Sequence, residues 1–163
     1  MTEEKTNVMR LLDKKKLPYK CHFYQTQEAL SGVEVARILG QDEKRVFKTL
    51  VTQAKSRKNY VFLIPVAKEL DLKKAAKAVG EKSIDIIKAK DLLPLTGYIH
   101  GGCSPIGMKK LFLTTIDESV LTWVSFCFSG GRIGCQVEVT VDGLKKIVPL
   151  ELCDISDPSD DLQ

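Results

Sequence analysis

The sequence predicts a compact α+β domain built on a mixed β-sheet. Helical and strand patterns are interleaved along the chain. At least two pairs of strands are joined as hairpins, which excludes a simple doubly wound parallel sheet. No linker, repeat or low-complexity segment divides the 163 residues, a length that suits one domain.

The N-terminal elements carry recognisable start and stop signals. Residues 7–16 predict a helix, because apolar side chains recur at helical spacing and Asn7 can cap the first turn. Residues 19–24 form a short strand candidate. The segment Ser31-Gly32-Val33-Glu34 is a capping box that begins a second helix, which Gly40 ends.

The centre of the chain predicts a hairpin of two strands. Residues 47–53 and 60–66 are strand-like, and the polar segment 55–59 connects them. The second strand is apolar on both faces and should therefore lie inside the sheet. The first strand contains Lys48 among apolar positions, so this lysine either reaches the solvent at a sheet end or points into a pocket.

The C-terminal half alternates short elements. In order, we expect a helix over 72–79 ended by Gly80, a strand over 83–87, a helix over 89–95 interrupted by Pro94, a strand over 111–116, a helical turn over 117–121, a hairpin of strands 124–128 and 133–141, a helix over 142–148 and a last strand over 150–155. The acidic tail 156–163 should be disordered, which leaves 1–155 as the domain.

Composition excludes several classes of protein. The chain is 44% hydrophobic and 28% charged, as expected for a globular protein. It has no apolar leader and no run near the ~20 apolar residues of a membrane span, so we expect a cytoplasmic protein without membrane contact. Five scattered cysteines without a CxxC motif argue against a disulfide framework and a zinc site. We expect neither metal nor cofactor.

Residues 97–110 form the most distinctive stretch, with four glycines and a proline before two lysines. Glycines let the backbone approach a ligand closely, and N–H groups in such a loop can hold a carbonyl oxygen or a carboxylate. Lys48 would add a compact positive charge that suits a phosphate. Ser129 could add a hydroxyl, although an ordinary tight turn also explains Gly130-Gly131. A net charge of +4 permits a phosphate-bearing partner.

No standard catalytic set is present. The sequence has no GxGxxG, P-loop or HExxH motif. His22 and His100 are the two histidines, and a dyad of Cys103 with His100 is conceivable because a thiolate nucleophile needs an adjacent base. Composition and spacing alone thus predict a glycine-lined pocket with a candidate lysine and no acid–base machinery.

Three motifs in register carry a resemblance to a known family. They are Val46–Leu50, the run from Thr96-Gly97-Tyr98 into Gly101–Gly107, and Ser129–Arg132. Together they resemble the YbaK/EbsC family, within the superfamily of prolyl-tRNA synthetase editing domains, over roughly residues 8–155. The resemblance implies a single α+β domain whose mixed, barrel-like sheet is flanked by helices.

The resemblance also implies an activity and its partners. Members of this family hydrolyse Cys-tRNA(Pro), the product of prolyl-tRNA synthetase when it mistakenly uses cysteine. In YbaK-like deacylases the thiol of the substrate cysteine is thought to attack its own ester. The protein then has to position the substrate and polarise its ester carbonyl. The implied partners are mischarged tRNA(Pro) and prolyl-tRNA synthetase; no oligomeric state is implied.

The resemblance assigns roles to particular residues. Lys48 should anchor the 3′-terminal nucleotide or the ester, Tyr24 should line the pocket, the loop residues Gly101, Gly102, Cys103, Ser104 and Pro105 should cradle the aminoacyl group, and Ser129 with Gly130 should meet its ammonium or carbonyl. Lys48, Gly101 and Gly102 are the candidate catalytic residues. Gln136 stands where relatives carry aspartate, so a carboxylate for the substrate amine is missing there. Cys103 loses the role of nucleophile, since the reactive thiol belongs to the substrate.

Three alternatives remain. The first is an alanyl-tRNA(Pro) deacylase of the same fold, although a pocket that depends on the substrate thiol would act slowly on alanine. The second is a non-catalytic module that binds tRNA or a synthetase through the lysine sets at 14–16, 55–58, 73–77 and 109–110. The intact Lys48 and the intact glycine loop, which comprises residues 97–110, argue against that module. The third is a soluble α+β domain of unknown role, which leaves the three motifs unexplained.

Overall fold

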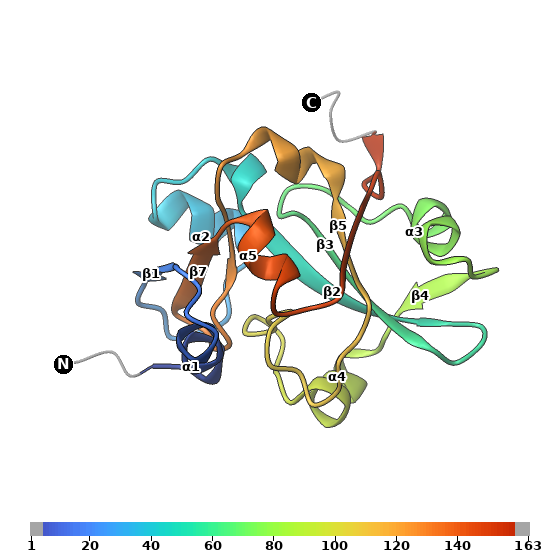
Figure 1. The fold of residues 1–163 in the computed structure, drawn as a ribbon, viewed down its shortest axis with the longest axis horizontal. Coiled ribbons are helices and arrows are strands. Elements are labelled where there is room, and N and C mark those ends of the chain that lie inside the picture. The colour runs from blue at the N-terminus through green and yellow to red at the C-terminus, as the bar shows by residue number, and fades with distance from the viewer. Residues whose placement is uncertain (1–4, 159–163) are drawn as a thin grey trace.

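The computed structural model describes residues 5–158 and contains short helices packed around two β-sheets (Figure 1). The helices are α1 (Asn7–Lys14), α2 (Gly32–Ile38), α3 (Leu72–Val79), α4 (Ala89–Thr96) and α5 (Val141–Lys145), with 3-10 turns η1 (Glu43–Arg45) and η2 (Glu118–Thr122). The strands are β1 (Lys20–Phe23), β2 (Phe47–Ala54), β3 (Asn59–Pro65), β4 (Ile84–Ile86), β5 (Thr114–Asp117), β6 (Phe126–Ser129), β7 (Cys135–Val139) and β8 (Leu150–Cys153). The predicted α+β class is confirmed.

The strands form two sheets, which corrects the expectation of a single barrel-like sheet. One sheet has the order β1-β7-β6 and is antiparallel; the other has the order β4-β2-β3-β5-β8 and is mixed. One isolated bridge, Val46 with Cys127, joins them. Side chains fill the space between the sheets instead, and the rings of Phe47 and Phe126 meet edge to face with their centroids 5.4 Å apart. The sheets therefore do not close into a barrel.

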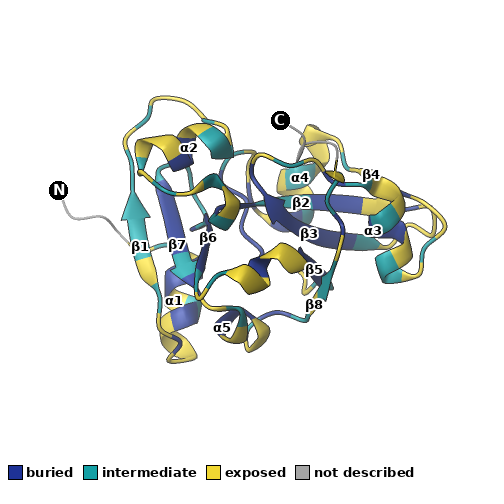
Figure 2. Ribbon diagram, turned by 90° about the horizontal axis from the view of Figure 1, so that it is seen from above, coloured by how far each residue is buried: buried dark blue, intermediate teal, exposed yellow. Residues whose placement is uncertain are grey.

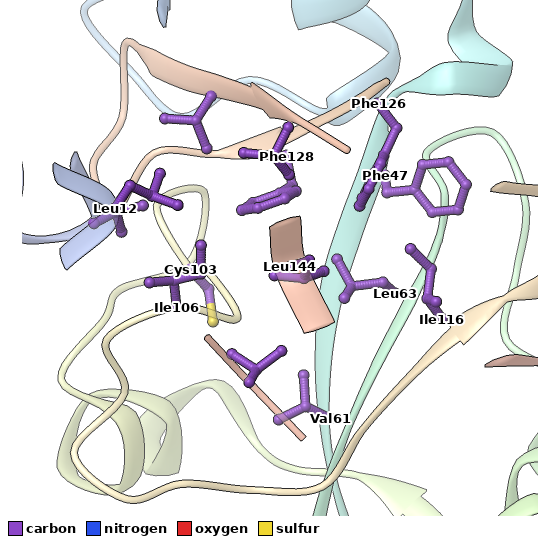
Figure 3. Packing of buried hydrophobic residues seen from close by; sticks show 14 of the residues in the cluster. Leu12, Phe47, Val61, Leu63, Cys103, Ile106, Ile116, Phe126, Phe128 and Leu144 are labelled. Carbon is purple, nitrogen blue, oxygen red and sulfur yellow. The ribbon is translucent and has the colours of Figure 1, made fainter. Parts of the chain in front are cut away.

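The main hydrophobic core lies between the two sheets (Figure 3). It combines apolar side chains of both sheets with those of α1, α5 and the glycine loop. Strand β3 is buried from Tyr60 to Pro65 and lies between β2 and β5, so its predicted central place is confirmed. Figure 2 shows the buried strands under helices whose outer faces are exposed.

Several element boundaries differ from the prediction. Thr6, and not Asn7, caps α1, because the Thr6 hydroxyl accepts the N–H of Met9. The capping box of Ser31 and Glu34 is confirmed. The predicted strand at 111–116 begins only at Thr114, where pairing with β3 and β8 starts.

One further expectation fails at Pro94, and the first residues of the tail make contacts. Helix α4 continues through Pro94 to Thr96, whose hydroxyl donates to the carbonyl of Leu92 and supports the last turn. In the first part of the tail, Ser156 pairs with Leu70 and the N–H of Asp157 donates to the carbonyl of Glu69. The rest of the tail prediction falls outside the described residues. Within 5–158, no helix has the length and apolar character that crossing a membrane requires.

Candidate functional site

A cavity of 370 Å³ lies where α2, the beginning of β2 and the β6–β7 hairpin meet the glycine loop. Its lining combines apolar side chains with a few polar groups, which is typical of small-ligand sites. The lining residues are Tyr24, Leu30, Ser31, Gly32, Val35, Val46, Phe47, Lys48, Thr49, Leu50, Val66, Leu92, His100, Gly101, Cys103, Phe128, Ser129, Cys135 and Gln136.

The structure brings six of the ten predicted site residues to this cavity: Tyr24, Lys48, Gly101, Cys103, Ser129 and Gln136. The other four, Gly102, Ser104, Pro105 and Gly130, are buried outside its lining. A Cβ on Gly102 would lie 3.1 Å from the Cα of Arg132, and one on Gly130 would lie 2.5 Å from the Sγ of Cys135. These two glycines thus allow close packing between the glycine loop, the 129–132 turn and β7.

The glycine loop is held by its own hydrogen bonds. Gly101 has a φ of +87°, a conformation that L side chains rarely adopt. The hydroxyl of Tyr98 donates to the carbonyl of Ile106, and the hydroxyl of Ser104 accepts the N–H of Ile106. Burial raises the pKa of Tyr98 to about 12, so this phenol remains a donor at neutral pH. These bonds link Tyr98, Ser104 and Ile106 across the glycine loop.

Lys48 lies at the cavity with a weakly engaged ammonium group. Its side chain is 30% exposed, and its Nζ is 4.0 Å from a carboxylate oxygen of Glu69. Glu69 is itself 74% exposed, and such exposed pairs contribute little to stability. Lys48 is among the residues that line the cavity, and its side chain is also partly exposed to solvent.

Thr49 is a polar residue of the cavity that the sequence did not single out. Its hydroxyl oxygen is buried and has no hydrogen-bond partner among the described residues. An unpaired buried hydroxyl costs about 1–3 kcal/mol. The hydroxyl of Ser129 accepts the N–H of Gly131 at 3.2 Å, which leaves its own proton available for donation. The hydroxyl of Ser129 can therefore donate a hydrogen bond at the cavity.

Gln136 forms a neutral amide pair with Gln41, another residue that the sequence did not indicate. The amide nitrogen of Gln41 donates to the Oε1 of Gln136 at 2.6 Å, and the reverse bond measures 3.1 Å. Gln136 is only 3% exposed. The wall on which relatives were expected to present a carboxylate is uncharged here.

Cys103 does not have the environment of a nucleophile. Its side chain belongs to the hydrophobic core and lies beside Ile106 (Figure 3). Burial raises the pKa of its thiol to about 12, so the thiol stays protonated at neutral pH. No hydrogen bond joins it to His100 within residues 5–158. A thiolate–imidazole dyad is therefore not formed.

One cluster outside the cavity has metal-binding residue types. His22, Cys127 and Glu138 place one ligand atom each within 4.8 Å of the others. The Glu138 carboxylate already accepts hydrogen bonds from His22 at 2.8 Å and from Arg45 at 2.7 Å, and from the hydroxyl of Ser125. The positive guanidinium beside the carboxylate disfavours a cation. We therefore interpret the cluster as an ion-pair network that ties β1, β6 and β7 to η1.

Replacement of Glu138 by Gln should destabilise the protein at neutral pH and not in strong acid. Burial alone would raise the pKa of Glu138, but hydrogen bonds from Ser125 and His22 and the charge of Arg45 lower it to about 2. The stabilisation is therefore present above the carboxyl group's unfolded pKa and is lost as the pH falls toward 2. Urea denaturation should give a wild-type advantage of about 2 kcal/mol at pH 7 that disappears near pH 2. An equal advantage at both pH values would contradict this origin.

The chain matches known proteins in sequence and in fold. The family model described as "Aminoacyl-tRNA editing domain" matches residues 26–147. The "Putative Cys-tRNA(Pro)/Cys-tRNA(Cys) deacylase EbsC" of Enterococcus faecalis is 41% identical over 156 residues, 95% of each chain. This relative confirms the resemblance to the YbaK/EbsC family.

Solved structures share the fold at low sequence identity. The crystal structure of "a putative trans-editing enzyme for prolyl tRNA synthetase" aligns with a TM-score of 0.79 and 21% identity, over 94% of this chain and 99% of that chain. The crystal structure of the hypothetical protein APE2540 aligns with a TM-score of 0.82 and 23% identity, over 92% and 99%. By the family model and by its relative over nearly the whole length, this chain belongs to the family of aminoacyl-tRNA editing domains.

Proposed function

We propose that the protein is a trans-editing deacylase that removes cysteine from mischarged Cys-tRNA(Pro). The observation that carries the proposal is a cavity that combines Lys48 with the positive-φ backbone of Gly101 and in which the thiol of Cys103 stays protonated. Such a cavity suits a substrate that brings its own nucleophile. The name of the E. faecalis relative, a Cys-tRNA(Pro)/Cys-tRNA(Cys) deacylase, supports the same substrate.

The proposed reaction is an intramolecular displacement. The sulfur of the substrate cysteine attacks its own ester carbonyl, and a C–S bond forms as the bond from the carbonyl carbon to the ribose oxygen breaks. The thiol proton ends on that ribose oxygen, which regenerates the tRNA hydroxyl. The other product is a four-membered thiolactone, which water opens to free cysteine after release. No oxidant or other co-reactant is needed.

The cavity residues accelerate this step by orientation and charge. We assign the loop backbone at Gly101, which lines the cavity, to the carbonyl oxygen, on which negative charge develops during attack. The ammonium of Lys48 stabilises the ester end or the adjoining phosphate. The hydroxyl of Ser129 supplies a hydrogen bond that holds the aminoacyl group in an attacking conformation.

Side-by-side deacylation of one tRNA(Pro) charged with cysteine, alanine or proline tests the substrate. We expect cysteine to be released fastest, because alanine and proline have no thiol. Faster release of alanine would show the sister activity instead. Binding of every charged tRNA without any hydrolysis would support a non-catalytic module.

Replacement of Cys103 by Ala should leave the deacylation of Cys-tRNA(Pro) within about threefold of wild type, because a thiol that stays protonated takes no part in the chemistry. Single-turnover release of labelled cysteine from the charged tRNA measures this. A loss of a hundredfold or more, with an unchanged unfolding midpoint, would instead make Cys103 the nucleophile.

The choice of tRNA is proposed to depend on prolyl-tRNA synthetase. In this proposal the cavity binds only the aminoacyl end of the tRNA, so it does not read the anticodon. We expect the isolated protein to act on both Cys-tRNA(Pro) and Cys-tRNA(Cys), and the synthetase to favour the former. Deacylation of the two substrates with and without the synthetase would reveal this, and an unchanged ratio would remove the synthetase as a partner.

A further inference from the structure

The wall of the cavity at Gln136 is polar, buried and neutral. Gln136 is 3% exposed and lies opposite Ser129 in the antiparallel pair of β7 and β6, and both residues line the cavity. The amide of Gln136 exchanges two hydrogen bonds with the amide of Gln41, at 2.6 and 3.1 Å. Gln41 follows α2 and lies outside the lining. The pair holds the Gln136 amide in place and brings no charge to the cavity.

The rest of the described lining also brings no negative charge. It contains no aspartate and no glutamate, and its basic side chains are those of Lys48 and His100. Burial raises the pKa of the Cys103 thiol to about 12, so this thiol is neutral as well. A cationic group that entered the cavity would therefore meet the like charge of Lys48 and no carboxylate among the described lining residues.

Two carboxylates close to the lining face basic side chains of the protein instead. Glu69 has a carboxylate oxygen 4.0 Å from the Nζ of Lys48 and is 74% exposed. Glu138 follows Gln136 by two residues in β7, and its carboxylate accepts a hydrogen bond from Arg45 at 2.7 Å. Neither glutamate is among the residues that line the cavity. Neither is therefore placed to give a substrate amine an ion pair inside it.

We propose that the cavity accepts β-mercaptoacyl esters whether or not they carry an α-ammonium group, so that its substrates include thiol-bearing acyl groups without an amine, such as 3-mercaptopropionyl-tRNA. This inference rests on the proposed function. The α-ammonium of a cysteinyl ester finds only neutral acceptors in the described lining, and hydrogen bonds between a charged and a neutral group are weaker than an ion pair with a carboxylate. The thiol, and not the amine, then selects the substrate.

The reaction is the same with and without the amine. The 3-mercaptopropionyl group carries its sulfur on the β-carbon, as cysteine does. The sulfur attacks the ester carbonyl, and a C–S bond forms as the bond from the carbonyl carbon to the ribose oxygen breaks. The thiol proton ends on that oxygen. The products are the free tRNA hydroxyl and a four-membered thiolactone, which water opens to 3-mercaptopropionate. The α-ammonium serves in no step as acid, base or leaving group.

One tRNA(Pro) acylated with cysteine or with 3-mercaptopropionate tests the proposal, because the two acyl groups differ only at the α-amino group. Single-turnover rate constants with the full-length protein are divided by those without protein, which removes the effect of the ammonium on the intrinsic reactivity of the ester and the thiol. The wild type should accelerate both releases to the same extent within about tenfold, as expected where only neutral partners meet the amine. A larger advantage of the cysteinyl ester would overturn the proposal.

The variant Gln136→Glu supplies the missing charge without a change of side-chain shape. Relative to wild type, it should shift the ratio of the two accelerations toward the cysteinyl ester by about tenfold or more, since hydrogen bonds between charged groups are the stronger ones. The matched control is Gln53→Glu, which adds the same charge at an exposed glutamine of β2 outside the lining and should keep the wild-type ratio. An unchanged ratio in Gln136→Glu, with an unfolding midpoint near that of wild type, would overturn the part assigned to the amide pair.

The same assay separates this inference from the proposed function. Accelerated release of both acyl groups would support both. Accelerated release of cysteine alone would leave the deacylase in place and reject the acceptance of acyl groups without an amine. Acceleration of neither release would reject the deacylase, and this inference with it.

Discussion

Replacement of Lys48 by Ala should lower kcat/KM for Cys-tRNA(Pro) about a hundredfold or more. Lys48 is the lysine among the described residues that line the cavity. Removal of one preorganised donor from a reacting centre typically lowers the rate by about 10²–10³. Stability should hardly change, since the Nζ–Glu69 separation is 4.0 Å and the pair is exposed. Steady-state deacylation and urea denaturation of the same preparation measure both effects.

The matched control for Lys48 is Lys55→Ala. Lys55 is exposed and follows β2 directly, at the end of the strand opposite to Lys48. Its replacement by Ala therefore removes the same charge without changing the cavity. Its activity should stay near that of wild type at moderate salt. Full activity in Lys48→Ala would show that Lys48 takes no part in the reaction. An equal loss of activity in Lys55→Ala would show that Lys48 acts only through the net charge of the protein.

Replacement of Gly101 by Ala should abolish most of the activity as well, through the backbone. Its φ of +87° is costly for alanine, by about 1–2 kcal/mol, and the new Cβ would lie 3.0 Å from the Cβ of Ala29. The loop must then move, and the backbone that we assign to the substrate carbonyl moves with it. We expect kcat to fall about a hundredfold, which single-turnover deacylation would show.

Two comparison variants separate displacement of the loop from a general loss of stability. Gly40→Ala introduces a similar strain at φ +65° with nothing within 4 Å of the new Cβ, so it should keep wild-type kcat. Adding Ala29→Gly to Gly101→Ala removes the steric contact but not the strain, and it should recover only part of the activity. Wild-type kcat in Gly101→Ala would mean that the loop backbone does not position the substrate.

Local patterns predicted the elements that frame the site. The capping box at Ser31 marked the start of α2, and the polar segment 55–59 marked the β2–β3 hairpin. The apolar character of β3 placed it inside its sheet. Glycine content identified the loop that contains Gly101, because a backbone that must approach a ligand or adopt a positive φ leaves a visible mark in sequence.

Features that depend on packing between distant segments had no such mark. Gln41 and Gln136 are 95 residues apart, and neither amide has a sequence context that indicates the other. In the sequence Thr49 is an ordinary strand residue. Only the fold shows that its buried hydroxyl has no hydrogen-bond partner among the described residues. The division into two sheets was hidden for the same reason, since it depends on how Phe47 and Phe126 fill the space between them.

The central claim is that the substrate supplies the nucleophile and the cavity supplies its orientation. Single-turnover deacylation of Cys-tRNA(Pro), compared with the same charged tRNA after methylation of the cysteine sulfur, tests it most directly. We expect rapid release of cysteine from the unmodified tRNA and a rate near that of the protein-free control for the S-methylated one. Equal rates for the two substrates would contradict attack by the substrate thiol and would require a nucleophile from the protein or from water.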